Sequence, residues 1–117
     1  MTAFSDIVEL LTSNLRDAGI EVTDGVAASN DIARVTFAGV MKDDGWWRSE
    51  VRVDYVHDTE PERADPILVE RRMHQVIRVL ERTDCLVISR IENPQVDRSG
   101  NLVTAYEAIA YITHEND

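Results

Sequence analysis

The sequence contains a single cysteine, Cys85, which excludes an internal disulfide and any zinc site built from several cysteines. No run approaches the ~18 apolar residues that a membrane-spanning helix needs. The first residues also lack the basic, apolar and small-residue pattern of a secretory signal. With 117 residues, the chain is long enough for one domain with a hydrophobic core and short for two. We therefore expect a soluble intracellular protein, with no membrane partner, whose single domain comprises residues 1–117.

Lysine is almost absent: Lys42 is the only one, and the other eleven basic residues are arginines. Twenty-two acidic residues against twelve basic ones give a formal net charge of −10. A protein that reads duplex DNA has the opposite, basic surface. The acidic residues are spread along the chain, and their densest group is Asp58, Glu60, Glu62 and Asp65. We interpret the segment that holds these four residues as a solvated acidic loop.

Hydrophobic periodicity predicts two helices. Apolar residues recur at three- and four-residue spacing over residues 4–18 and again over residues 65–83. Asp65 and Pro66 are typical of a helix start, because an aspartate side chain caps free N–H groups and proline lacks the one that would stay unpaired. Gly19 stands where a helix often ends in a left-handed conformation.

Alternating apolar and polar residues predict strands around these helices. The clearest is a hairpin with an Asp-Gly turn at residues 44–45, whose second strand alternates Val51 and Val53 with charged residues. Its first strand places Phe37 and Met41 on one face. The strands expected in all are residues 20–26, 32–41, 46–55, 85–92 and 102–113. The predicted class is α+β, a single domain with a mixed or antiparallel sheet of four to five strands and two helices packed on one face.

The last predicted strand is apolar on both faces, although helices on one side of a sheet leave its other face to water. Val103, Ile109 and Tyr111 lie on this second face, which either another chain or the protein's own loops must cover. Trp46 alternates onto the charged face of its hairpin, where an aromatic side chain suits an interface unless it folds back over its own sheet. We select these four residues as candidate oligomer or partner contacts.

No pattern typical of catalysis occurs, since the sequence has no glycine-rich phosphate loop, nucleophile elbow or paired-histidine metal motif. A small enzyme that uses His57 with Asp54 is one alternative, although near neighbours on a strand point to opposite faces. We expect His74 on the surface of the second helix and Cys85 as a buried, inert thiol. The prediction is a protein that is not an enzyme, with no catalytic residue, metal ion or cofactor.

Five segments, taken with the acidic loop and in this order, carry a resemblance to a known family: Ile7-Val-Glu-Leu-Leu-Thr-Ser-Asn-Leu-Arg, Gly19-Ile-Glu-Val, Val51-Arg-Val-Asp-Tyr-Val, Glu70-Arg-Arg-Met-His-Gln-Val-Ile and Ala108-Ile-Ala-Tyr-Ile. Over nearly the full chain, the layout resembles the tail terminator proteins of long-tailed phages, the family that contains the minor tail protein U type. Other small neck and tail-completion proteins of phages have a similar layout.

The resemblance implies a structural protein of the virion that is assembled in the host cytoplasm and lies at the head-proximal end of the tail. It implies a ring, usually a hexamer, that caps the tail tube, stops polymerisation of the tube protein and joins the neck of the head. DNA passes through such a ring without specific binding.

A ring needs two different contact patches per subunit, which the four candidate contacts supply. The acidic loop is a candidate lining of the channel or of its outer rim. The alternative function is an acidic inhibitor or antitoxin-like protein that binds a basic partner.

Overall fold

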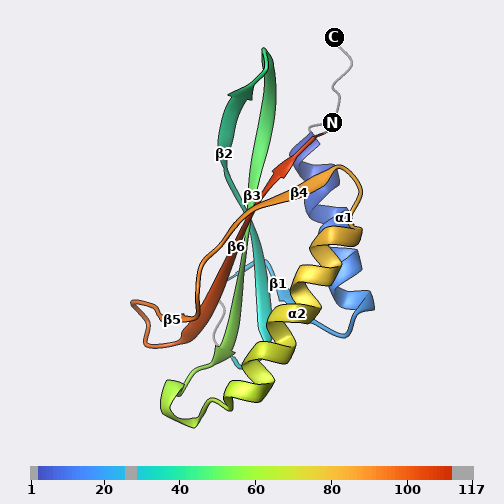
Figure 1. The fold of residues 1–117 in the computed structure, drawn as a ribbon. Coiled ribbons are helices and arrows are strands. Elements are labelled where there is room, and N and C mark those ends of the chain that lie inside the picture. Colours follow the sequence, from blue (N-terminus) through green and yellow to red (C-terminus); the bar gives the residue numbers. More distant parts are fainter. Residues whose placement is uncertain (1–2, 26–28, 112–117) are drawn as a thin grey trace.

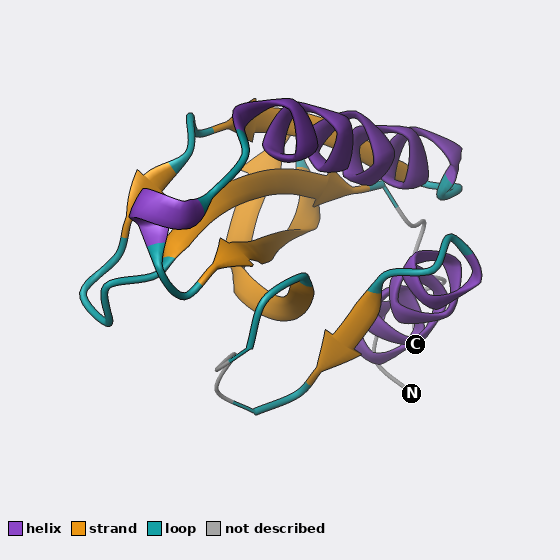
Figure 2. Ribbon diagram, turned by 90° about the horizontal axis from the view of Figure 1, so that it is seen from below, coloured by secondary structure: helices purple, strands orange, loops and turns teal. Residues whose placement is uncertain are grey.

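The computed structural model describes residues 3–25 and 29–111, and two α-helices lie on one side of a twisted sheet (Figures 1 and 2). This confirms the predicted α+β class. The elements follow in the order α1 (Ala3–Asp17), β1 (Glu21–Thr23), β2 (Ile32–Asp43), β3 (Trp46–Asp58), the 3-10 helix η1 (Pro61–Arg63), α2 (Pro66–Arg82), β4 (Leu86–Ile91), β5 (Gln95–Val96) and β6 (Leu102–Ala110).

The sheet has six strands in the order β1-β2-β3-β6-β4, with β5 paired to β6. β1 runs parallel to β2, and the other pairs are antiparallel, so the sheet is mixed. The strand beyond the expected four to five is β5, a two-residue segment inside the connection between β4 and β6. One side of β6 pairs with β3, and the other side of β6 is shared by β4 and β5.

Both helices have the ends that their sequences predict. The N–H of Ile67 donates to Asp65 Oδ1 at 2.9 Å, and Pro66 occupies the first position of α2. The chain leaves α1 through Gly19, whose φ of +82° favours glycine. These ends fix where each helix lies along the sheet.

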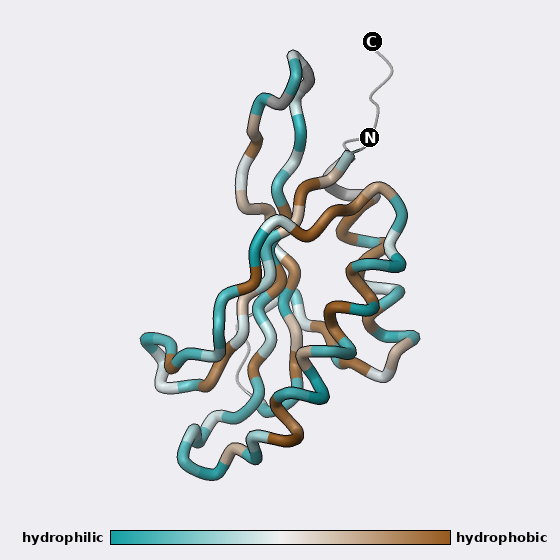
Figure 3. The backbone as a smooth tube through the Cα atoms, viewed as in Figure 1, coloured by the Kyte–Doolittle hydropathy of each residue, from teal (hydrophilic) through white to brown (hydrophobic). Residues whose placement is uncertain are grey.

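The core lies between the helices and the two central strands. Along the tube in Figure 3 both helices alternate hydrophobic and hydrophilic residues, as helices covered on one side do. Each large side chain buried here contributes roughly 1.5–3 kcal/mol from the removal of apolar surface from water. The buried apolar residues of these four elements are Ile7, Leu11, Leu15, Val76, Val79, Leu80, Val51, Val53, Tyr55, Tyr106, Ala108 and Ala110.

The hairpin of β2 and β3 extends beyond the other strands (Figure 1). The last pair between β3 and β6 joins Ser49 to Ala110, so that further along β2 and β3 pair only with each other. We call residues 40–49 the arm, and at about 3.3 Å per residue it is roughly 15 Å long. Its turn is as predicted, with φ of +49° at Asp44 and +82° at Gly45.

Two local predictions are wrong. Met41 does not share a face with Phe37, because a bulge between Phe37 and Gly39 adds one residue to β2 and reverses the faces beyond it. Cys85 is exposed rather than buried. It precedes β4 in a turn with φ of +65°, which directs the chain from α2 into the sheet.

The two buried tyrosines give a matched stability test. The Tyr55 hydroxyl donates to Asp31 Oδ1 at 2.8 Å. The Tyr106 hydroxyl is buried and has no hydrogen-bond partner among the described residues. We expect Tyr55→Phe to lower the free energy of unfolding by about 1–2 kcal/mol and Tyr106→Phe to leave it unchanged or raise it. Urea unfolding measures both, and equal losses would show that the Tyr106 hydroxyl is hydrogen-bonded.

Candidate interaction surfaces

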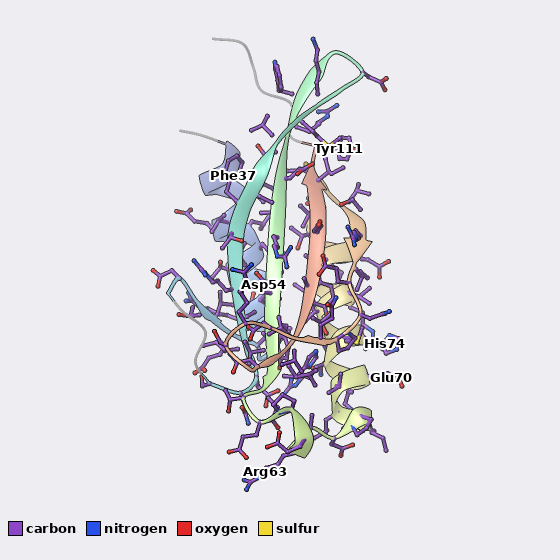
Figure 4. The ribbon with its side chains drawn as sticks, turned by 90° about the vertical axis from the view of Figure 1, so that its left-hand side faces the viewer. Phe37, Asp54, Arg63, Glu70, His74 and Tyr111 are labelled. Atoms are coloured by element: carbon purple, nitrogen blue, oxygen red, sulfur yellow. The ribbon has the colours of Figure 1, made fainter. Side chains whose placement is uncertain are left out.

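The face of the sheet opposite the helices, which we call the open face, is partly covered by the chain's own connection between β4 and β6 (Figure 4). Val56 and Ala105 are only 2% and 4% exposed there. A cavity of about 350 Å³ lies at this connection, lined by both residues together with Val103 and Val96. The candidate Val103 is thus half-buried and paired with Gln95 of β5 rather than free. On this half of the open face, the apolar residues are therefore covered by the chain's own loop and not by another chain.

The middle of the open face carries an ion-pair network. Arg52 Nε lies 3.0 Å from Asp54 Oδ1, and Arg52 Nη2 lies 3.9 Å from Glu92 Oε2 (Figure 4). Arg90 Nη2 adds a contact of 4.0 Å to the other carboxylate oxygen of Glu92. These contacts pair the carboxylates of Asp54 and Glu92 with the guanidinium of Arg52.

The candidates Ile109 and Tyr111 lie at the far end of β6, roughly 20 Å from Val103. Ile109 pairs with Val87 of β4, whose side chain is 54% exposed. The guanidinium of Arg48 lies 4.6 Å from the centroid of the Tyr111 ring, in a cation–π contact, and its Nε has no hydrogen-bond partner among the described residues. We call Val87, Ile109 and Tyr111 the upper patch.

The arm supplies a second apolar surface. Trp47 is 63% exposed and Val40 is 54% exposed, and Lys42 Nζ lies 5.9 Å from the Trp47 ring. The backbone of the candidate Trp46 pairs with Asp43 near the arm's turn, and its side chain lies outside the described part of the structure.

Sequence reasoning missed the exposure of Trp47, because the alternation places it on the same face as the buried Val51. The reason lies in the observed strand lengths, which differ from the predicted ones. β3 has 13 residues and β6 has only 9, so one end of the hairpin has no third strand beside it. Val40 and Val87 were also not selected from the sequence. They became interface candidates only once the strand order placed them at the two edges of the sheet.

The acidic loop uses most of its carboxylates locally. Asp58 Oδ1 accepts from the N–H of Glu60 at 2.8 Å, and Glu60 Oε2 pairs with Arg63 Nε at 2.8 Å. Asp65 caps α2, and of the four predicted residues only Glu62 makes no hydrogen bond or ion pair within the described part of the chain. The loop lies at the end of the sheet opposite the arm, as Arg63 and Tyr111 show in Figure 4.

His57 and Asp54, which the sequence suggested as a pair, lie on opposite faces of the sheet. His57 is buried, and its Nε2 lies 2.6 Å from Thr104 Oγ1 on the side of the helices. Asp54 lines the cavity on the open face, so the pair drawn from the sequence does not meet. His74 is exposed beside Glu70 at 3.7 Å, on the surface as expected. Burial lowers the pKa of His57 to about 4, while the charge of Asp31 acts weakly in the other direction.

Within residues 3–25 and 29–111, no group of three or more histidine, cysteine or acidic side chains is arranged to hold a metal ion. In the same residues, no helix has both the length and the apolar character needed to cross a bilayer.

Comparison with known proteins identifies no relative: no protein-family model matches the chain, and no curated protein is similar to it. The arm and the upper patch are two exposed apolar surfaces on opposite sides of the sheet.

The buried histidine predicts a specific pH dependence of stability. Between pH 6.5 and 4 the unfolded chain binds a proton at His57 that the folded chain binds only near pH 4. Stability therefore falls by roughly 2–3 kcal/mol as the pH drops through this window. In urea unfolding, His57→Gln should flatten this part of the pH profile, while the exposed control His74→Gln keeps the wild-type slope. A profile unchanged by His57→Gln would contradict a buried neutral imidazole.

Proposed function

We propose that this protein is a structural subunit that assembles head to tail into a ring and acts as the tail terminator of a long-tailed phage. In this proposal a ring of six copies caps the tail tube and stops polymerisation of the tube protein. It lies at the head-proximal end of the tail, after assembly in the host cytoplasm, and binds the neck protein on its other side. DNA passes through the ring without specific binding, and the protein has no enzymatic activity.

The observation that carries the proposal is the pair of separate apolar surfaces. The arm exposes Val40 and Trp47 on one strand pair, and the upper patch exposes Val87 on the strand at the opposite edge of the sheet. A closed ring needs heterologous contacts, in which one surface of each subunit meets a different surface of the next. An arm that projects beyond the sheet is also long enough to reach past its own subunit, toward a neighbour or the tube.

The charge of the chain supports passage of DNA. A subunit with a net charge of −10 repels phosphates, so DNA sliding past it is not held by the counterion release that drives non-specific binding. The acidic loop of Asp58, Glu60, Glu62 and Asp65 lies at the end of the sheet away from the arm. In the ring it lines either the channel or the rim on that side.

The acidic inhibitor is less well supported. An inhibitor that captures a basic partner needs free carboxylates gathered on one face. In this structure Glu60 pairs with Arg63, and Asp54 and Glu92 both lie on Arg52. Two large side chains exposed at the arm, Val40 and Trp47, are apolar or aromatic, which suits burial against another protein surface.

The first test is the mass of the purified, reduced protein in solution by light scattering over a wide concentration range. We expect the mass to rise with concentration toward six subunits. Added to a polymerising tail tube protein, the protein should shorten the tubes and remain at one end of them. A protein that stays a monomer, and leaves tube length unchanged, would contradict the proposal. Capture of a basic partner that is lost at high salt would then favour the inhibitor.

A further inference from the structure

We propose that neighbouring copies pair edge to edge, with the outer edge of β4 of one copy hydrogen-bonded to the outer edge of β2 of the next. The sheets of successive copies then form one continuous sheet around the assembly, antiparallel where two copies meet. This inference rests on the proposed ring and specifies how its subunits join.

The stretches of the two edges that meet in this arrangement pair with no other strand in the described part of the chain. β1 pairs with β2 only at Ile32, Ala33 and Arg34, so at Gly39, Val40 and Met41 the outer side of β2 has no partner strand there. β4 is the last strand at the other side of the sheet. Each edge therefore presents backbone N–H and C=O groups that another strand can pair with.

These stretches of β2 and β4 lie in the same rows of paired residues across the sheet. Ser49 of β3 pairs with Val40 on one side and Ala110 on the other, and Ala110 pairs in turn with Leu86. One row along, Gly39 and Val87 are connected in the same way through Glu50 and Ile109. A copy placed beside another without a shift along the strands thus brings β2 against β4, not against β5 or a loop.

The strand directions also agree. The four strands β2, β3, β6 and β4 are antiparallel at every step, so β2 and β4 run in opposite directions. A second copy in the same orientation therefore presents a β2 that is antiparallel to the β4 it meets. Such a contact joins two different edges, so it can continue around a ring, whereas pairing of β4 with β4 closes a dimer.

The rows that meet carry few of the charges that usually keep sheet edges apart. Residues 35–41 of β2 contain no charged side chain, and β4 contains only Arg90, in a protein that is 29% charged. Lys42 and Asp43 follow further along the arm, beyond the row of Cys85. Lysine or other charges on an edge strand normally block pairing with a second chain. A bulge interrupts each edge, at Ala38 and at Ser89, so the rows that face each other without interruption are Gly39 with Val87 and Val40 with Leu86, followed by Met41 with Cys85.

The side chains along these stretches fit a close approach. Gly39 has no side chain in the row of Val87, which is 54% exposed on the open face. Val40 is equally exposed, on the other face, in the row of Leu86. Pairing the edges removes both valines from water and puts apolar groups beside apolar groups.

The native cysteine allows a direct test by disulfide crosslinking. The N–H of Tyr111 donates to the carbonyl of Cys85, which places the exposed Cys85 one row beyond Leu86. Met41 lies in the corresponding row of β2, one beyond Val40. In this arrangement a cysteine at position 41 lies in the row of Cys85 of the next copy, close enough for a disulfide to form. After mild oxidation of the assembled protein, we expect Met41→Cys to give a ladder of multimers on a denaturing gel.

The matched control is Thr36→Cys, on the same strand and about 17 Å further along β2. It also has two cysteines per chain, so random oxidation would produce ladders from both variants. We expect no multimer larger than a dimer from Thr36→Cys. Equal ladders from the two variants, or none from Met41→Cys, would overturn the pairing.

A second pair of variants tests the contact without crosslinking. Val87→Glu places a carboxylate in the joined sheet, and we expect it to raise the concentration for half-assembly by about tenfold or more. Val96→Glu on β5 changes a valine of similar exposure, 59%, away from the joined stretch, and should leave assembly unchanged.

The outcomes separate this inference from the ring proposal. If the protein assembles to six copies but neither Met41→Cys nor Val87→Glu behaves as expected, the ring stands and the edge pairing is wrong. A stable dimer crosslinked through Cys85 alone would indicate that β4 pairs with β4, and would also overturn it. If Val87→Glu abolishes assembly and Met41→Cys crosslinks the assembled copies, the results support both the ring and the edge pairing.

Discussion

The packing of α1 and α2 against Val51, Val53 and Tyr55 is the interaction on which the rest of the structure depends. These alternate residues of β3 are 0–1% exposed, and β2 and β6 pair with this strand on either side. The helices and β6 cover only part of the long hairpin. The part of the hairpin that extends beyond them, which includes Val40 and Trp47, is exposed to water or available to another molecule.

Much of the fold could be predicted because its signals are local. The cap at Asp65, the left-handed Gly19 and the Asp-Gly turn each depend on a few neighbouring residues, and the structure has all three. The errors came from features without a local signal. A single inserted residue at the bulge after Phe37 reversed the face of Met41, and a left-handed turn exposed Cys85. Strand order depends on contacts between distant residues, so the sequence does not indicate which edge of the sheet β1 occupies.

The surfaces were harder to predict than the core, because exposure depends on what lies opposite a residue and not on its own strand. Val103 and Ile109 share one face of β6, but the connection through β5 covers the first and leaves the second beside Val87. From the sequence, the apolar second face of β6 could be covered either by a loop of the same chain or by a partner. The structure has the loop at one end of β6, and the other end is where the proposed partner acts.

The short parallel strand β1 has a consequence for register. A pleated strand that slips by two residues keeps all its side chains on the same faces, so hydrophobic alternation does not oppose such a slip. β1 fills the edge of β2 at Ile32, Ala33 and Arg34. A strand added to β2 from outside is therefore sterically stopped from sliding toward the start of β2. Three residues that contribute little to the core thereby limit the number of alignments available to any strand that docks on this edge.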